Sequence, residues 1–199
     1  MVRQTCGSMP PARTMPSSSG RDFITSLGEG GIALSSISFE EIMFTIMSAA
    51  QDTFKSYMDT EIYAGKVEKK INPMGSDVVG IIGVAGDRVG YILFATEKTS
   101  AIQIAKELLM MDEPDDESIN DAVGEVTNNI AGVFKTKYHE QYGSVALGLP
   151  LIFSGRLRPI TNPPEAAPKD GSMSIQCKGV TIPFTTMDGR ITFRVMVYM

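Results

Sequence analysis

Glu125 and Asn128 are the side chains of this sequence whose types and spacing could do chemistry on another molecule. On a helix, with about 100° and 1.5 Å per residue, they would lie roughly 60° apart and one turn from each other. A carboxylate and a carboxamide would then stand side by side, and Gly124 and Gly132 would leave the helix surface around them low. The pattern therefore predicts a polar site that another protein could approach closely.

The Glu-x-x-Asn spacing carries little information by itself, because so short a pattern also arises by chance. Glu117 and Asn120 show the same spacing, and we interpret them as first-turn capping and helix-dipole residues. The residues around Glu125 and Asn128 indicate that this pair has a function. Each glycine there lowers helix stability by about 1 kcal/mol relative to alanine, and each asparagine by about half that or more. A helix that retains such residues on its exposed side is expected to use that surface.

The sequence offers no nucleophile–base constellation and no metal site. His139 is the only histidine, and we interpret it as a helix-end residue rather than a catalyst. Cys6 and Cys177 can form neither a disulfide framework nor a zinc site, which favours a reducing compartment.

The helix that would present the pair is predicted from about residue 117 to 141, after an acidic loop at 112–116 whose carboxylates suit the positive end of the helix dipole. The stripe that we expect to be buried consists of Ile119, Val123, Val126, Ile130, Val133 or Phe134, and the aliphatic stem of Lys137. About half a turn around the helix lie Asp121, Glu125, Asn128, Gly132 and Lys135.

Two further helices and six strands are expected to position this helix. The first helix spans 39–58 behind a capping box of Ser38 and Glu41, and the second ends near Met110 with Thr96 as its N-cap. Strands are predicted at 62–71, 77–84, 88–95, from 149–153, at 174–185 and at 190–198, with turns at 85–87 and 187–189. This order predicts an α+β fold of two layers, with the helices packed on one face of a mostly antiparallel six-stranded sheet.

Length and composition indicate one domain, at residues 37–199. Residues 1–36 are rich in Ser, Pro, Gly and Met without an apolar period, which predicts a disordered N-terminal arm. The net charge of −5 and the pI near 5.0 disfavour a nucleic-acid partner. The most apolar run, 78–96, is interrupted by Asp87 and Arg88, so we expect no membrane span.

Residues 121–136, D-A-V-G-E-V-T-N-N-I-A-G-V-F-K-T, and 147–155, L-G-L-P-L-I-F-S-G, resemble the CheX branch of the CheC/CheX/FliY phosphatase family. The resemblance spans about residues 39–199, and its specific core is the D-A-x-G-E-x-x-N-x-x-A-G-x-x-K-T run together with the L-P-x-x-x-x-G strand. The first helix has no Glu-x-x-Asn, which agrees with a CheX-like protein that has a single site.

The resemblance implies a bacterial cytoplasmic phosphatase that acts on the aspartyl phosphate of a CheY-like receiver domain, in chemotaxis or another two-component pathway. Glu125 would bind the receiver's active-site lysine, and Asn128 would reach the phosphorylated aspartate and orient water for in-line attack. Mg²⁺ would belong to the receiver, and this chain would carry no cofactor. An acyl phosphate is already activated, so positioning of water and completion of the receiver's charge array can suffice.

The residues implied in further contact with the receiver are Asp121, Gly124, Asn129, Gly132 and Lys135. Asn129 adjoins Asn128, so either carboxamide could be the one that is presented, although the spacing and the apolar stripe favour Asn128. Two alternatives stay open. One is an adaptor that binds a receiver without hydrolysing its phosphate, and the other is a structural dimer whose helix packs on a partner.

A homodimer through sheet edges is also expected, by analogy with CheX relatives that form symmetric dimers by joining their sheets. The apolar C-terminal run 195–198 could offer such an edge. The alternative is that this run forms an interior strand of the monomer's own sheet.

Overall fold

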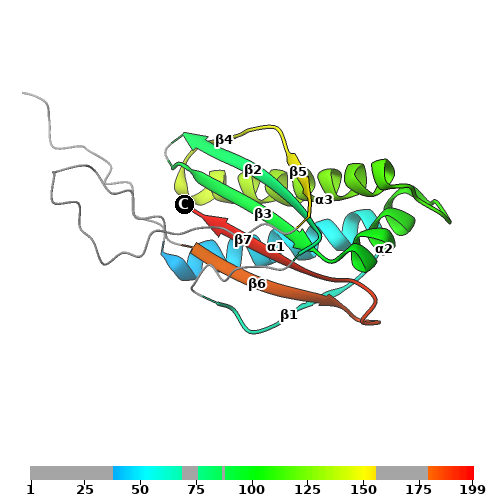
Figure 1. Cartoon of the computed structure of the whole chain (residues 1–199). Helices are drawn as coiled ribbons and strands as arrows, with labels where there is room; N and C mark the ends of the chain where they lie inside the picture. Colours follow the sequence, from blue (N-terminus) through cyan, green and yellow to red (C-terminus); the bar gives the residue numbers. More distant parts are fainter. Residues whose placement is uncertain (1–37, 69–75, 87, 156–178) are drawn as a thin grey trace, which may run out of the picture. The chain divides into compact units, whose positions relative to one another are not determined.

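The computed structural model describes residues 38–68, 76–86, 88–155 and 179–199 (Figure 1). The expected N-terminal arm and both cysteines lie outside the described residues. In chain order the elements are α1 (Phe39–Met58), β1 (Ile62–Ala64), β2 (Val78–Gly86), β3 (Gly90–Thr96), α2 (Lys98–Leu109), α3 (Asp116–Tyr142), β4 (Val145–Leu147), β5 (Leu151–Ser154), β6 (Gly179–Thr186) and β7 (Thr192–Tyr198).

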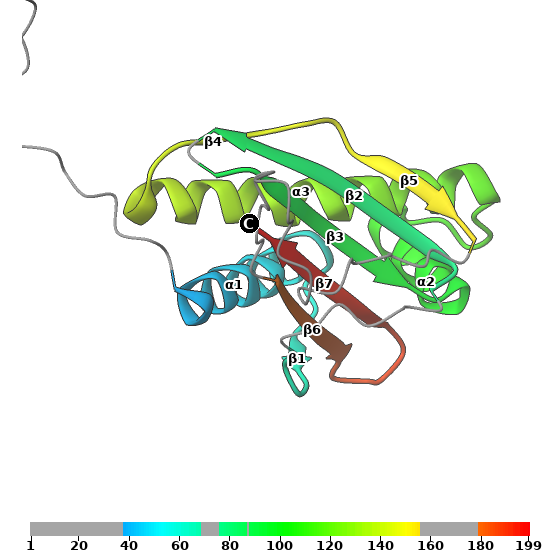
Figure 2. The same ribbon diagram turned by 60° about the vertical axis from the view of Figure 1, so that its left-hand side comes forward.

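The strands form one antiparallel sheet in the order β1-β6-β7-β3-β2-β4, and β5 also pairs with β2. Figure 2 shows all three helices on one face of this sheet, as predicted for a two-layer α+β fold. The sheet has seven strands within the described residues, so the expectation of six was wrong. The missed strand, β4, has only three residues, too few to show an alternating pattern, and it precedes β5 along the same edge of β2.

The core lies between the helices and the sheet, and stacked aromatic rings fill one part of it. The Phe193 ring lies 4.5 Å from that of Phe54 on α1, 4.9 Å from that of Phe94 on β3 and 5.2 Å from that of Phe184 on β6, measured between centroids. All four side chains are buried. This stack joins α1 to three neighbouring strands through apolar contact.

The capping box of α1 is confirmed. The Ser38 backbone N–H donates to Glu41 Oε2 at 2.6 Å, and the Glu41 N–H donates to Ser38 Oγ at 3.1 Å. Hydrogen bonds from the backbone and then the side chain of Ser38 to the Glu41 carboxyl hold the pKa of that carboxyl below its ordinary value. The helix therefore begins at the residue that the sequence predicts.

Thr96 does not cap α2, contrary to the prediction. It is the last residue of β3, and its hydroxyl donates to the Thr192 carbonyl at 2.7 Å. Glu97 occupies the N-cap position without a capping side chain, and the Lys98 backbone N–H instead donates to Asp77 Oδ2 at 3.0 Å. A side chain distant in sequence thus satisfies the first turn of this helix.

The C-terminal strand cannot offer a sheet edge, because β7 lies between β6 and β3. That expectation was wrong, and the alternative of an interior strand is correct. In the described sheet the free edges belong to β1 on one side and to β4 and β5 on the other. Among the described helices, none combines the length and the apolar character that crossing a membrane requires.

Candidate functional site

Helix α3 has a polar contact at each of its ends. Asp115 is the N-cap, and its Oδ1 accepts a hydrogen bond from the Ser118 N–H at 2.8 Å. Hydrogen bonds from Ser118 lower the pKa of the Asp115 carboxyl, as expected at the positive end of a helix. At the other end His139 Nδ1 lies 3.3 Å from the Gly143 carbonyl oxygen, so its predicted place at the helix end is confirmed.

The inner side of α3 packs directly on β2. Thr127 is fully buried, and its hydroxyl donates to the Val123 carbonyl at 2.6 Å. Gly80 of β2 lies beneath it so closely that an added Cβ would stand 2.1 Å from Thr127 Oγ1. The buried residues of α3 are Ile119, Ala122, Val123, Gly124, Val126, Thr127, Ile130, Ala131, Phe134 and Tyr138. They include most of the predicted stripe, and they turn the opposite side of the helix toward solvent.

Lys137 contributes to this packing through its charge as well as its stem. Its ammonium pairs with Asp52 of α1 at 2.9 Å, and the lysine side chain is 33% exposed. The ion pair, which the apolar pattern did not predict, links α3 to α1 behind the exposed side.

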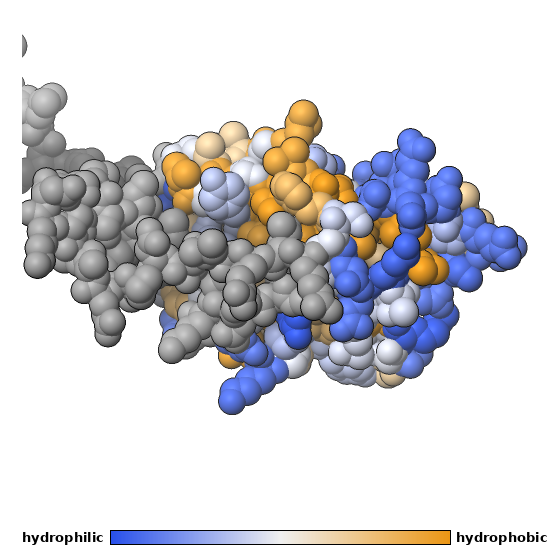
Figure 3. Space-filling model, in the orientation of Figure 1, coloured by the Kyte–Doolittle hydropathy of each residue, from blue (hydrophilic) through white to orange (hydrophobic). Residues whose placement is uncertain are grey.

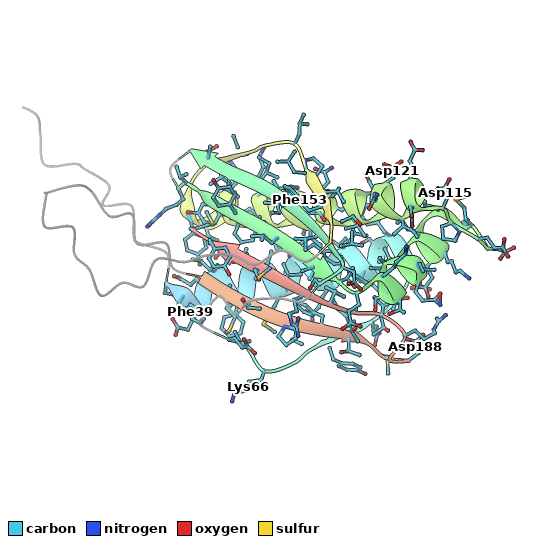
Figure 4. The ribbon with its side chains drawn as sticks, viewed as in Figure 1. Phe39, Lys66, Asp115, Asp121, Phe153 and Asp188 are labelled. Atoms are coloured by element: carbon cyan, nitrogen blue, oxygen red, sulfur yellow. The ribbon has the colours of Figure 1, made fainter. Side chains whose placement is uncertain are left out.

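The outer side of α3 carries four of the predicted site residues in exposed positions: Asp121, Glu125, Asn128 and Lys135. Figure 4 shows Asp115 at the start of the helix and Asp121 farther along it. Gly132 is partly exposed, and apart from its chain neighbours and the backbone of its own helix no described residue lies within 4 Å of where its Cβ would stand. The helix surface is therefore low beside Asn128, as predicted for Gly132.

Gly124 does not belong to this open surface, contrary to the prediction. It is buried, and an added Cβ would lie 3.5 Å from Ile152 of β5. Since Gly124 lies about 100° around the helix from Glu125, it falls on the flank that β5 covers. The small size of Gly124 lets β5 pack closely on α3, and it does not open the helix surface to a partner protein.

The two neighbouring asparagines differ in their contacts. Asn129 is half-buried, and its Nδ2 donates to Glu125 Oε1 at 3.1 Å, one turn away. Asn128 is exposed, and within the described part of the chain its carboxamide has no recorded hydrogen bond. The contact between Asn129 and Glu125 was missed at the sequence level, although the i, i+4 spacing of an acid and an amide is a recognised signal.

A second exposed feature follows α3 at the edge of the sheet. Leu149 is 86% and Leu151 60% exposed, and Phe153 is also exposed. Figure 3 shows hydrophobic side chains gathered over this part of the sheet, where β5 pairs with β2. The alternation at 149, 151 and 153 indicates a strand with one apolar face, and no described element covers that face in full.

The described residues include no group of three His, Cys, Asp or Glu side chains that could hold a metal ion. A hollow of about 120 Å³ lies against β3, β6 and β7 and includes Thr96, Pro183 and Arg194 in its lining, but no residue of α3. The polar pair on α3 is exposed and lies outside this hollow, which suits contact with a macromolecule better than enclosure of a small ligand.

The sequence places this fold in a family. The family model described as "Chemotaxis phosphatase CheX" matches residues 78–185, which is more than half of the chain. The chain belongs to the CheX family. The matched residues include β2, β3, α2, all of α3, β4 and β5, so the exposed pair lies inside the family region.

Solved structures of CheX and CheX-like proteins have the same fold. A chemotaxis protein CheX from Desulfovibrio desulfuricans shares 24% identity over 80% of this chain and 99% of that chain, with a TM-score of 0.65. A putative chemotaxis protein from Desulfovibrio vulgaris Hildenborough shares 25% over 82% and 100%, with a TM-score of 0.66. The CheX of a CheX–CheY–BeF3–Mg²⁺ complex from Borrelia burgdorferi shares 22% over 79% and 96%, with a TM-score of 0.60. No curated protein matches the sequence significantly.

Proposed function

We propose that this CheX-family protein hydrolyses the aspartyl phosphate of a CheY-like response regulator, with Glu125 and Asn128 as its functional pair. One observation carries the proposal: on the exposed side of α3, Asn128 presents a carboxamide that no described residue engages, one turn from the carboxylate of Glu125. The complex of a structurally similar CheX with CheY, BeF3 and Mg²⁺ supports a receiver as the partner.

The proposed roles follow from the chemistry of the two groups. Glu125 binds the lysine ammonium of the receiver's active site, which fixes the helix against the phosphorylated aspartate. Asn128 holds a water molecule in line with the phosphorus, because a neutral carboxamide can both donate and accept a hydrogen bond without being consumed. Positioning can supply a large rate factor for an acyl phosphate that is already activated. Asp121, Gly132 and Lys135 would contact the receiver around this pair.

The proposed division of cofactors is that Mg²⁺ stays with the receiver. The described residues of this chain offer no cluster that would replace it, and the Borrelia burgdorferi complex contains Mg²⁺ together with CheY. We further propose the bacterial cytoplasm as the site of action, because CheY-like receivers act there.

A homodimer through a sheet edge is proposed as well. The edge formed by β4 and β5 is the better candidate, because it is longer than β1 and carries the exposed Leu149 and Leu151. Leu151→Lys would place a charge in this interface. We expect it to convert a dimer into a monomer in light scattering, and a monomeric wild type would contradict the proposed dimer.

The test of the proposed activity separates binding from hydrolysis. A CheY-like receiver of the same organism is phosphorylated with acetyl phosphate, and its decay is followed after removal of the donor. Wild type should accelerate the decay, whereas Asn128→Ala should leave it near the intrinsic rate and still bind the BeF3-loaded receiver. Asn120→Ala is the matched control, because Asn120 lies on the same helix and has the same spacing from Glu117; it should behave as wild type.

Glu125→Ala should fail in a different way. Loss of one partner of an intermolecular charge pair costs about 2 kcal/mol or more, which corresponds to a roughly 30-fold weaker affinity for the receiver. The adaptor alternative predicts instead that Asn128→Ala and wild type give the same decay rate.

A further inference from the structure

The carboxylate of Glu125 is held in place before any partner arrives. Asn129 Nδ2 donates to Glu125 Oε1 at 3.1 Å, and Asn129 itself is a half-buried residue of α3. An exposed glutamate ordinarily samples many rotamers, and binding through it costs the entropy of choosing one. A hydrogen bond from a partly buried neighbour removes part of that freedom.

The charges along α3 favour the same orientation. Asp121 lies one turn before Glu125 on the exposed side, and like charges at i, i+4 repel each other. Asn129 lies one turn after Glu125 and attracts it. The carboxylate is thus biased toward the turn that contains Asn128, so the two proposed functional groups are drawn together.

One oxygen of the carboxylate stays available in this arrangement. The recorded contact uses Glu125 Oε1, and a carboxylate has about four acceptor positions on its two oxygens. Oε2 can therefore accept from a cationic group of a partner without loss of the internal hydrogen bond. Asn129 and an incoming ammonium can bind Glu125 at the same time.

Given the proposed function, on which this assignment rests, we infer that Asn129 is a positioning residue that preorganises Glu125 for the lysine of the receiver. It acts through Glu125 and does not touch the phosphoryl group. Asn129 therefore contributes to the affinity for the receiver, whereas the rate of hydrolysis within the complex depends on Asn128. The two adjacent carboxamides have separate roles.

The experiment measures KM and kcat for a phosphorylated CheY-like receiver and Kd for its BeF3-loaded form. Asn129→Ala should raise KM and Kd about threefold to tenfold and leave kcat within twofold. Asn129→Asp, which replaces the donor by a like charge, should weaken binding more than Asn129→Ala, and Asn129→Gln, which keeps a donor, should recover part of the loss. Asn120→Ala should change neither constant, and neither alanine variant should lower the melting temperature, because alanine is the better helix former.

A double-mutant cycle with Glu125→Ala is decisive. If Asn129 acts through Glu125, adding Asn129→Ala to Glu125→Ala should cause no further loss of affinity. Equal and additive losses in the two backgrounds would overturn the assignment, and so would Asn129→Ala with the Kd of wild type. A wild type that neither binds the receivers nor accelerates their decay would overturn the proposed function itself, and the assignment with it.

Discussion

Gly80→Ala tests how tightly α3 is seated on the sheet. The new Cβ would lie 2.1 Å from Oγ1, 3.0 Å from Cβ and 3.1 Å from Cγ2 of Thr127. Thr127 is fully buried and β-branched, and its hydroxyl is engaged with the Val123 carbonyl, so it cannot turn away. The helix must therefore move outward by about 1 Å to restore van der Waals contact.

Overpacking of this kind costs about 1–3 kcal/mol. For a domain of this size, about 2 kcal/mol lowers the melting temperature by roughly 4–8 °C. The affinity for the receiver per folded molecule should stay close to that of wild type, because Glu125 and Asn128 lie on the same helix and move together. Thermal unfolding followed by circular dichroism measures the first effect, and binding to the BeF3-loaded receiver measures the second.

Gly83→Ala is the matched control, because Gly83 lies on the same strand and, its chain neighbours aside, no residue in the described part of the protein comes within 4 Å of its added Cβ. It should leave the melting temperature unchanged or raise it. Thr127→Ala should partly restore the stability of Gly80→Ala, since it removes two of the three close atoms. A Gly80→Ala protein as stable as wild type would refute the close contact between Gly80 of β2 and Thr127 of α3.

The remaining predictions concern other positions on the helices. Gly124→Ala should stabilise the protein by about 0.5–1 kcal/mol without loss of receiver affinity, because its Cβ meets Ile152 at an ordinary 3.5 Å. Weakened binding by this variant would show instead that Gly124 contacts the receiver. Gly132→Ala should stabilise to a similar extent but weaken binding, because its Cβ enters the space left for the receiver; unchanged affinity would remove Gly132 from the interface. Hydrogen bonds from serine lower the pKa values of the Glu41 and Asp115 carboxyls in the folded protein. The stability that these two carboxylates give to the fold is therefore fully present above their unfolded pKa values of about 4, and it is lost as the pH falls through the lower folded values. Denaturant titrations at several pH values below 5 should show that alanine at either position makes stability less dependent on pH, and an unchanged slope would contradict this.

Local signals predicted the helices well. The reciprocal hydrogen bonds of Ser38 and Glu41 act within one turn, so the beginning of α1 can be read from four residues. The buried stripe of α3 is likewise a matter of helical period. The exposure of Glu125 and Asn128 follows from that stripe, which is why the pair could be placed before the structure was known.

Features set by distant parts of the chain were not predictable in this way. Thr96 has a good capping side chain, but its partner is the carbonyl of Thr192, which only the sheet brings near. Gly124 lies on a flank whose burial depends on where β5 runs. The position of β7 inside the sheet depends on the order of all seven strands, and a run of apolar residues at the chain end does not reveal it.

The most direct test of the central claim is the decay rate of a phosphorylated CheY-like receiver at increasing concentrations of this protein. The proposed function predicts acceleration that saturates with wild type, and a rate near the intrinsic one at every concentration of Asn128→Ala, although that variant still binds the BeF3-loaded receiver. Equal acceleration by wild type and Asn128→Ala would contradict the role of the carboxamide. Binding of the receiver by wild type without any acceleration would identify the protein as an adaptor.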